Sequence, residues 1–538
     1  MSEVELIESA IACHSEGKLR EADALYGEFL KIQPQHPDAL HLKGVALFQL
    51  NDAASAEPLL RKAISINAGE PDYHSNLGLI LQALGKRHEA LESFRTAVAL
   101  QPDFRDALIN LARLELKLNL SANAASTFRK IIGKDETDTN LLREFVAALI
   151  ENGELPEAER LCRRTLALDP TNVESLVSLG HLQQVMKLPD EAEKTYLAAL
   201  KWDPKNVRAT NNIGTVHMMR EQPEIALEWF LKAVRLDEDF VEAFFNAGIA
   251  YKDIGDLSTA ANYFNAAISR KKDLPRAYRY LSELYRARGK RDLQQETLRA
   301  WLDVSPDSAT AKHLLAASQG ESSVLRASDD FIREEFDDFA DTFNEKLEKL
   351  EYTTPQKLID LLGQQDVPPN SLDRALDAGC GTGLCGAGIA DLARSVVGVD
   401  LSSKMLQQAS VLGIYEELVE DELVAFMRSR PATFDLVVSA DTLVYFGALE
   451  SVVDAARTTL TPGGLFAFSV ELMEGPGSDG FRLRDSGRYC HAESYVESCL
   501  TNAGFRVSEK EAAPIRIEVN RPVIGLLVVA TLALRDSI

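Results

Sequence analysis

The N-terminal half of the sequence repeats itself at an interval of 34 residues. Nine segments follow one another without insertion, and they begin at Glu3, Pro37, Pro71, Arg105, Thr139, Val173, Val207, Val241 and Pro275. The twentieth position of the first eight segments is always alanine, and the eighth is glycine in five, namely Gly44, Gly78, Gly180, Gly214 and Gly248. Ala112 replaces that glycine in the fourth segment, and the bulkier Val146 departs from the pattern in the fifth. A fixed period of this length is typical of stacked arrays, in which each unit buries its apolar face against its neighbours.

This pattern closely resembles tetratricopeptide repeats, each of which is a pair of antiparallel helices. Small residues at the eighth and twentieth positions let the two helices approach, because a larger side chain would hold them apart. The ninth segment has Gln294 where the others have alanine, and Ala309–Ala317 is expected to form a closing helix. A terminal unit with a more polar outer face is what such an array requires. The resemblance predicts an all-α superhelix over residues 1–320.

Four asparagines occupy the sixth position of their segments, which places them on the first helix of each pair: Asn76, Asn110, Asn212 and Asn246. The row resembles the asparagine ladder of the O-linked N-acetylglucosamine transferase superhelix, and it predicts a peptide or protein partner in the groove. A carboxamide both donates and accepts, so it can pair with an extended peptide backbone. Asparagines that are merely solvated are the alternative. Glu144 and Ser178 interrupt the row.

The segment Ala375–Asp400 has the pattern of a strand, a glycine turn, a helix and a second strand. Gly379, Gly381 and Gly383 follow the first strand, and glycine is favoured where a backbone approaches a ligand or adopts positive φ. A helix that follows such a turn offers its unpaired N–H groups to the ligand. Asp400 ends the second strand, 21 residues after Gly379, where an acid can accept both hydroxyls of a ribose.

The wider context of this turn resembles class I S-adenosylmethionine-dependent methyltransferases. LDAGCGTG resembles their first motif and VGVD their second, while Phe434–Asp441 resembles the fourth-strand motif and Leu460–Gly464 the turn before the fifth strand. Gly381–Gly386 also satisfies G-x-G-x-x-G, which is a weak signal when it stands alone. A nicotinamide-dinucleotide site and a purely structural Rossmann-like domain are therefore the alternatives.

Strand-like runs alternate with helical ones after Ser371, at 374–378, 395–399, 417–419, 434–439, 464–470, 505–509 and 523–533. This alternation predicts a mostly parallel sheet that is covered on both faces, with ligands at the carboxyl ends of its strands. The predicted fold class is an all-α TPR superhelix followed by an α/β Rossmann-like class I methyltransferase domain over residues 325–538.

The junction between these two parts has a polar segment, Gln319–Ser328, which is expected to be a linker. The next segment, residues 331–362, carries an apolar stripe at helical spacing: Phe336, Phe339, Phe343, Leu347 and Leu350. By resemblance to small-molecule methyltransferases, FDDFADTF would be a lid over the cofactor and Tyr352 a pocket aromatic. An amphipathic helix docked on the sheet edge is the other interpretation, and both can hold together.

The methyltransferase resemblance implies a role for each motif residue. Gly379, Gly381 and Gly383 would approach the methionine portion of the cofactor, S-adenosyl-L-methionine, and Asp377 would fix its amino group. Further along the chain, the residues expected to hold the ribose, the adenine and the sulfonium are Asp400, Leu401, Asp421 or Glu422, Ser439, Ala440 and Tyr445.

A candidate for proton transfer follows from the stretch Arg488–His491, which contributes the only histidine of the last domain. The near-neutral reference pKa of an imidazole suits a general base, so His491, with Tyr489 beside it, is the predicted catalytic group. Capping of the helix expected over Glu493–Ala503, or packing against Tyr495, is the alternative role of His491.

The 538-residue chain has a formal net charge of −24, which argues against nucleic acid as a main partner. Its six cysteines form no C-x-x-C pair and suit a reducing cytoplasm. No metal-ligand cluster and no signal peptide are apparent, and the longest apolar run, Val523–Leu534, is too short for a membrane span.

The sequence therefore predicts an S-adenosylmethionine-dependent methyltransferase whose repeats recruit a protein substrate or a complex that contains the acceptor. The fourth strand ends in Ser-Ala-Asp-Thr and lacks the motif of enzymes that methylate planar nitrogens. The alternative is an interaction scaffold whose C-terminal domain binds the nucleoside without turnover.

Overall fold

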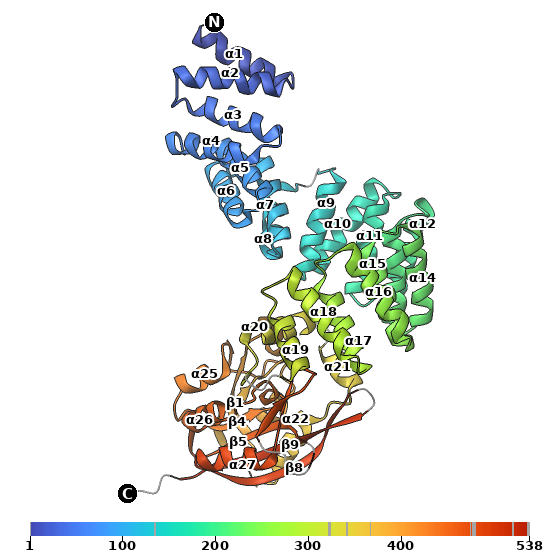
Figure 1. Cartoon of the computed structure of the whole chain (residues 1–538), viewed down its shortest axis with the longest axis vertical. Coiled ribbons are helices and arrows are strands. Elements are labelled where there is room, and N and C mark those ends of the chain that lie inside the picture. The colour runs from blue at the N-terminus through green and yellow to red at the C-terminus, as the bar shows by residue number, and fades with distance from the viewer. Residues whose placement is uncertain are drawn as a thin grey trace. The chain divides into compact units, whose positions relative to one another are not determined.

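The structure is a computed structural model that describes residues 2–133, 136–320, 324–340, 343–365, 367–473, 475, 480–518 and 521–534, without the side chains of residues 338, 339, 346 and 349. The chain divides into two compact units, Met1–Asp256 and Leu257–Ile538. The first unit is all helical and the second contains both helices and a sheet, so the fold is a repeat superhelix followed by an α/β domain (Figure 1).

The first unit consists of helices that alternate along the 34-residue repeats. They are α1 (Glu3–Ser15), α2 (Leu19–Ile32), α3 (Pro37–Gln49), α4 (Ala53–Ile66), α5 (Pro71–Ala83), α6 (Arg87–Leu100), α7 (Arg105–Lys117), α8 (Ser121–Ile131), α9 (Thr139–Glu151), α10 (Leu155–Leu168), α11 (Val173–Val185), α12 (Pro189–Trp202), α13 (Val207–Met219), α14 (Pro223–Leu236) and α15 (Val241–Ile254).

The glycine at the eighth position of a repeat receives a large side chain from the second helix of the same repeat. A Cβ atom added to Gly78 would lie 2.6 Å from the ring of Phe94, and one added to Gly214 would lie 2.5 Å from the ring of Phe230. In these two repeats the space that glycine leaves is thus filled by an aromatic ring, which would have to shift to admit a side chain at the glycine position.

The exception in the fifth repeat is balanced within its own pair of helices. Val146 takes the place of glycine, and Cys162 stands sixteen residues later, where Phe94 and Phe230 stand in their repeats. Both residues are buried in one apolar cluster. A larger residue on one helix is therefore matched by a smaller residue on the other, which conserves the volume of the core.

The second unit begins with the last helices of the repeat pattern and continues into the sheet. Its helices are α16 (Leu257–Arg270), α17 (Pro275–Ala287), α18 (Arg291–Val304), α19 (Ala309–Gln319), α20 (Asp329–Phe339), α21 (Phe343–Lys349), α22 (Thr354–Gly363), α23 (Gly386–Leu392), α24 (Ser403–Ser410), α25 (Leu423–Ser429), α26 (Glu450–Thr459) and α27 (Glu493–Asn502), with a short 3₁₀ helix, η2 (Leu443–Tyr445). Its strands are β1 (Leu372–Ala378), β2 (Ala393–Asp400), β3 (Glu417–Glu420), β4 (Phe434–Ser439), β5 (Leu460–Leu472), β6 (Phe481–Leu483), β7 (Tyr489–His491), β8 (Phe505–Glu518) and β9 (Arg521–Leu532).

The strands form one sheet in the order β3-β2-β1-β4-β5-β7-β6. The first five of these strands pair in parallel, and β7 also runs parallel to the end of β5. β9 pairs antiparallel with both β5 and β8, and β6 pairs antiparallel with β7. The sheet is mostly parallel at the site end, as the sequence predicts, and closes with antiparallel hairpins.

Apolar residues alternate between the two faces of the sheet. Leu376 and Val397 face one core, which also holds residues of α25, α26 and α27, whereas Ala375 and Val396 face a second core with residues of α22 and α23. Helices thus cover both faces, which is the arrangement that buried parallel strands require.

Two features of this unit differ from the sequence prediction. The strands β6 and β7 were not expected, and the predicted linker Gln319–Ser328 is structured at both ends, since Gln319 ends α19 and its later residues bond to the sheet domain. Arg326 forms an isolated bridge with Phe446, and the N–H of Ala327 donates to the carbonyl of Tyr445 over 2.9 Å. Residues 321–323 of that segment lie outside the described residues. The domain boundary expected near residue 320 stays a prediction. The compact unit that contains the sheet begins earlier, at Leu257, and therefore includes α16–α19.

Candidate functional site

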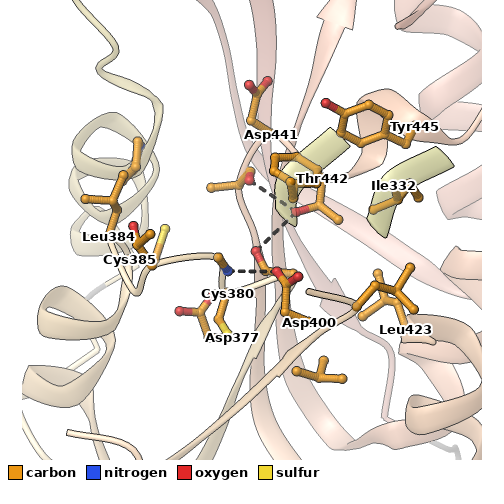
Figure 2. A pocket seen from close by; sticks show the side chains of 18 of the residues that line it. Ile332, Asp377, Cys380, Leu384, Cys385, Asp400, Leu423, Asp441, Thr442 and Tyr445 are labelled. Carbon is orange, nitrogen blue, oxygen red and sulfur yellow. Dashed lines mark hydrogen bonds between the residues drawn. The ribbon is translucent and has the colours of Figure 1, made fainter. Parts of the chain in front are cut away.

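A cavity of about 1010 Å³ opens at the carboxyl ends of β1, β2 and β4. The turn after β1, the end of β2, the loop after β4 and helices α20 and α21 all supply residues that line it. Figure 2 shows side chains from these separate segments around the same space. This is the edge at which open α/β sheets bind their ligands.

The glycine turn after β1 forms one wall of the cavity. Gly379 and Gly381 both have positive φ, at 79° and 54°, and both line the cavity. A Cβ atom at Gly379 would overlap the side chain of Thr442, whereas nothing lies within 4 Å of one at Gly381. Gly383 has φ 88° and points away from the lining, where a Cβ would lie 2.6 Å from Leu412. Gly379 and Gly381 therefore present only backbone atoms to the cavity, whereas Gly383 allows the close packing of Leu412.

Asp400 at the end of β2 lines the cavity and fastens the turn to the neighbouring strand. Its Oδ2 accepts a hydrogen bond from the N–H of Gly381 over 2.8 Å, and its Oδ1 accepts from the N–H of Ser402 over 2.9 Å. A carboxylate can accept about four hydrogen bonds, so both oxygens retain capacity for a ligand. Burial raises the pKa of Asp400. Leu401, the next residue, is 8% exposed and also lines the cavity.

Asp377 lies at the end of β1 with 2% of its surface exposed. The hydroxyl of Tyr415 donates to its Oδ2 over 2.8 Å. Burial raises the pKa of Asp377 to about 7, and the nearby carboxylate of Asp400 acts in the same direction. A buried acid that lines a cavity with one hydrogen-bond donor is placed to receive a cationic group from a ligand.

The two acids after β3 have different roles in the structure. Asp421 lines the cavity. Glu422 does not, because its carboxylate accepts from the N–H groups of Val424 and Ala425 and caps α25. Glu422 also pairs with Arg326 at 3.0 Å. The structure thus brings only the first of these two acids to the cavity.

The loop after β4 supplies the part of the cavity wall that adjoins the glycine turn, because Thr442 contacts Gly379. Ala440 and Tyr445 line the cavity, as expected, but Ser439 is buried beneath it and donates to the carbonyl of Ala378 over 2.9 Å. Asp441 and Thr442 also line the cavity and were not among the predicted site residues. The sequence signal for them was present, because Asp441 ends the fourth-strand motif and Thr442 directly follows it.

Asp441 is held in a strained conformation by a buried charge network. Its φ is 55°, which is uncommon for a residue other than glycine. Nη1 of Arg516 lies 3.2 and 3.3 Å from its two carboxylate oxygens, and its N–H donates to Oγ of Ser469 over 2.8 Å. Strain of this kind is commonly retained at functional sites.

The network extends from Arg516 to three further charged residues. Arg516 contacts Glu471 through Nη2, and its Nε donates to Glu518 over 2.8 Å. Glu518 also pairs with Arg488 at 3.1 Å. Arg488 lines the cavity and is the first residue of the stretch Arg488–His491, from which Tyr489 and His491 were the predicted catalytic groups. These residues come from β5, β8 and the turn between β6 and β7, so no short motif joins them.

The segment predicted as a lid covers the cavity with apolar side chains. Ile332, Phe336, Phe343 and Leu347 of α20 and α21 line it, together with Tyr352. The ring of Phe336 lies 5.9 Å from that of Phe343 and 5.7 Å from that of Tyr445, both edge to face. Leu350 does not line the cavity, and the side chain of Phe339 lies outside the described residues.

The structure does not bring His491 and Tyr489 to the cavity. The imidazole of His491 is fully buried, and its Nε2 lies 2.8 Å from the carbonyl of Phe446 and 3.1 Å from that of Gly447. Burial lowers the pKa of His491 to about 4. The hydroxyl of Tyr489 donates to the carbonyl of Val324. The geometry corrects the expectation of a general base here, because both side chains are bonded to backbone carbonyls. His491 instead stacks at 6.2 Å on Tyr495, the packing role left open from the sequence.

The asparagines of the repeat helices are engaged with side chains from the preceding repeat. Nδ2 of Asn76 lies 2.8 Å from Nε2 of His41, and Nδ2 of Asn246 lies 3.0 Å from Oδ1 of Asn211. Asn212 donates to the hydroxyl of Tyr196, and Asn110 is half-buried on α7. These contacts give three of the four asparagines a structural role between repeats.

The described part of the chain contains neither a cluster of metal-binding side chains nor a helix that could span a membrane. No group of three or more histidine, cysteine, aspartate or glutamate side chains gathers there as a metal site. Every helix in the same residues is too short or too polar to cross a membrane.

Comparisons with known proteins agree with this architecture. A family model described as a methyltransferase domain matches residues 376–468, and models described as tetratricopeptide repeats match residues 14–80, 75–139, 149–211 and 241–274. The ubiquinone biosynthesis O-methyltransferase of Paraburkholderia phymatum is 34% identical over 103 residues, which cover 18% of this chain and 43% of that protein. The enzyme of the same description from Ralstonia nicotianae is 34% identical over 112 residues, or 20% and 46% of the two chains. The chain thus spans less than half the length of these relatives.

Solved structures that resemble the chain include tetratricopeptide repeat proteins. A tetratricopeptide repeat protein from Parabacteroides merdae is 19% identical, with a TM-score of 0.43 over 46% of this chain and 98% of that chain. YrrB, described as a TPR protein with an unusual peptide-binding site, is 21% identical, with a TM-score of 0.28 over 34% and 95% of the two chains.

Proposed function

Because the chain carries tetratricopeptide repeats followed by a methyltransferase domain, we propose that it is an S-adenosylmethionine-dependent methyltransferase. The observation that carries the proposal is the cavity wall formed by Gly379, Gly381 and Asp400. The backbone of the glycine turn lines the cavity, and the carboxylate of Asp400 on the next strand is hydrogen-bonded to that turn. The agreement of this wall with the matched methyltransferase family supports the assignment.

The residues present fit the chemical groups of that cofactor. A Cβ atom at Gly379 would overlap Thr442, so only glycine leaves room for the ligand at this point. Asp377 is a buried acid suited to an ammonium group, because a cation restores the charged form that burial disfavours. Asp400 has lone pairs for the ribose hydroxyls, and Asp421 has them for an adenine amino group. Leu401 offers an apolar surface beside the adenine.

When bound there, S-adenosylmethionine supplies a methyl carbon that an acceptor nucleophile attacks as the carbon–sulfur bond breaks, with the electron pair passing to sulfur. The task of the protein is therefore to align the acceptor and to exclude water. Phe336, Phe343 and Tyr445 perform the second part of this task, because their rings close the cavity on the side of α20 and α21. No proton transfer is assigned to His491 or Tyr489, since neither lines the cavity.

The repeat array is proposed to recruit a protein partner, which is either the substrate or a carrier of the acceptor. Tetratricopeptide repeats expose long helical surfaces, and these surfaces are suited to binding extended segments of other chains. The asparagine row is retained as the proposed contact, although three of its members already bond within the array. Their carboxamide oxygens and remaining N–H groups are what a peptide backbone would meet.

The test uses the full-length protein and methyl-labelled S-adenosylmethionine. Binding is measured by calorimetry, and cell extract is then incubated with protein and label to detect a methylated product. We expect micromolar binding and transfer of label to a discrete product. A protein that binds the cofactor but labels nothing would be a nucleoside-binding scaffold, and a protein that fails to bind would overturn the site assignment.

A further inference from the structure

A second cavity, of about 650 Å³, adjoins the first within the unit Leu257–Ile538. Helix α17 supplies one face to it, through residues that lie three, four and seven positions apart: Arg279, Ser282, Glu283 and Arg286. Gln294 of α18 and Leu314 of α19 line it too, so part of the repeat pattern forms one wall.

The other wall of this second cavity belongs to the sheet domain. It consists of Phe331 and Glu335 of α20, the turn residues 485–488 except Gly487, and Glu518 of β8. Tyr445 and Arg488 line both cavities. A molecule in the second cavity would therefore be next to the first cavity, the proposed cofactor site, at these two side chains.

The turn that carries Arg488 is seated on the repeat helices. Nε2 of His313 on α19 lies 2.7 Å from the carbonyl oxygen of Gly487 and donates to it. Burial lowers the pKa of His313, which agrees with a neutral imidazole in this contact. The ring of His313 also stacks on Phe331 at 4.1 Å. The shared wall between the two cavities is thus positioned by α19.

Most charges of the second cavity are already paired. Arg279 pairs with Glu335 at 2.5 Å and with Glu283 at 3.1 Å. Glu518 is held by Arg488 at 3.1 Å and by Nε of Arg516 at 2.8 Å. These pairs leave little charge free to recognise a ligand.

Arg286 is the exception among the arginines that line the second cavity. It is half-buried and forms no ion pair with any residue that the structure describes, although it is close enough to help lower the pKa of Glu518. Asp485 also lacks an ion pair with the described residues, but it is exposed to solvent, where its charge is screened. A half-buried guanidinium without a partner is suited to a carboxylate or phosphate group, which it can hold through two parallel hydrogen bonds.

We propose that this second cavity is the acceptor site and that it binds a small molecule whose carboxylate or phosphate group is held by Arg286. This inference rests on the proposed methyltransferase function. It assigns to the last repeat a part in substrate selection that is separate from the recruitment of a protein partner. The nucleophile of the acceptor then points past Tyr445 and Arg488 toward the cofactor cavity.

The experiment uses the full-length chain, methyl-labelled S-adenosylmethionine and a small-molecule extract of the producing cells. Labelled products are separated on an anion exchanger at neutral pH. Arg286→Gln, Arg286→Lys and wild type are compared over a dilution series of the extract. Arg288→Gln is the matched control, because Arg288 is a half-buried arginine just after α17, like Arg286, but does not line the cavity. Calorimetry with S-adenosylmethionine is repeated for every variant.

We expect the wild type to label a product that the anion exchanger retains. Arg286→Gln should raise the half-saturating extract concentration at least tenfold with a similar plateau rate, whereas Arg286→Lys should recover most of the loss and Arg288→Gln should match the wild type. A product that is not retained, label in protein alone, no labelled product, or an unchanged Arg286→Gln variant would each overturn the acceptor site while cofactor binding stands. A wild type that does not bind S-adenosylmethionine would overturn both this inference and the proposed function.

Discussion

The carboxylate of Asp400 accepts the N–H of Gly381 over 2.8 Å, and this bond ties the end of β2 to the turn after β1. The two cofactor motifs, which lie about twenty residues apart in the sequence, are thus fastened to each other by the protein itself. The wall of the cavity is set before any ligand arrives, so little binding energy is spent on ordering it.

Replacement of Asp400 by alanine should weaken S-adenosylmethionine binding by about 30-fold, because it removes a charged acceptor worth about 2 kcal/mol. Calorimetry on the full-length protein measures the change. Asp391→Ala is the control, since Asp391 is an exposed acid on α23 that does not line the cavity. Equal affinity of the two variants would contradict the role of Asp400.

Gly379→Ala should reduce cofactor affinity at least tenfold, since its Cβ would overlap Thr442, a residue of the cavity wall that would have to move. Gly504→Ala isolates the backbone cost, because Gly504 has φ 83° and open space around it. Both variants should lose about 1 kcal/mol of unfolding free energy from positive φ. Only the first should lose affinity, and a loss shared by both would point to general destabilisation.

The affinity for S-adenosylmethionine should rise with pH up to about 7 and level off above it. Burial raises the pKa of Asp377 to about 7, and only its charged form attracts an ammonium group. Calorimetry from pH 5.5 to 8.5 in buffers of different ionisation enthalpy should detect proton release below the midpoint. Asp377→Asn should flatten the profile and lower affinity at pH 8.

The same raised pKa makes Asp377 a source of pH-dependent stability in the free protein. A carboxyl group whose folded pKa exceeds its unfolded value of 3.8 stabilises the fold at low pH. That contribution is lost as the pH rises toward 7. The melting temperature of the wild type should therefore fall more between pH 4 and pH 7 than that of Asp377→Asn. An equal fall in the two proteins would refute the raised pKa of Asp377.

Asp421→Ala and Glu422→Ala should separate binding from stability. Asp421 lines the cavity, so its loss should weaken cofactor binding with little change in melting temperature. Glu422 caps α25, so its loss should cost about 1 kcal/mol of stability with affinity retained. Calorimetry and thermal unfolding on both variants provide the comparison, and the reverse pattern would restore Glu422 as the ligand residue.

His491→Ala should destabilise the fold by about 2 kcal/mol, because the carbonyls of Phe446 and Gly447 would lose their buried donor. Burial lowers the pKa of His491 to about 4, below its ordinary 6.5, so its contribution is present above pH 6.5 and lost as the pH falls toward 4. The pH profile of methyl transfer should be unchanged in the variant at a temperature where it is folded. If the variant lost the acidic or the alkaline limb of the pH–rate profile, His491 would be the general base.

The parts of the fold that the sequence predicted are encoded in short windows. The 34-residue period, the turn at Gly379 and the five parallel strands each depend on neighbours along the chain. Their motifs pointed to Asp377, Asp400 and Tyr445, which line the cavity, while the roles of these residues toward a cofactor stay predictions. Local patterning predicts local geometry, and the motif order then fixes which strand ends meet.

The remaining features depend on contacts between distant segments. Asp441, Glu471, Arg488 and Arg516 meet only because the fold brings together the loop after β4, the strands β5 and β8 and the turn before β7. The strands β6 and β7 have three residues each, which is too short for an alternating pattern to show. His491 was misjudged because its burial depends on the loop after η2, which supplies the carbonyls it bonds.

Gln294, the residue that breaks the alanine column of the repeats, borders the second cavity and is 2% exposed. The irregularity is thus more than a sign that the array is ending. Earlier repeats can drift in sequence, or change in number, so long as neighbouring helices still stack. The ninth repeat has less freedom, because its side chains must also match whatever molecule that cavity admits.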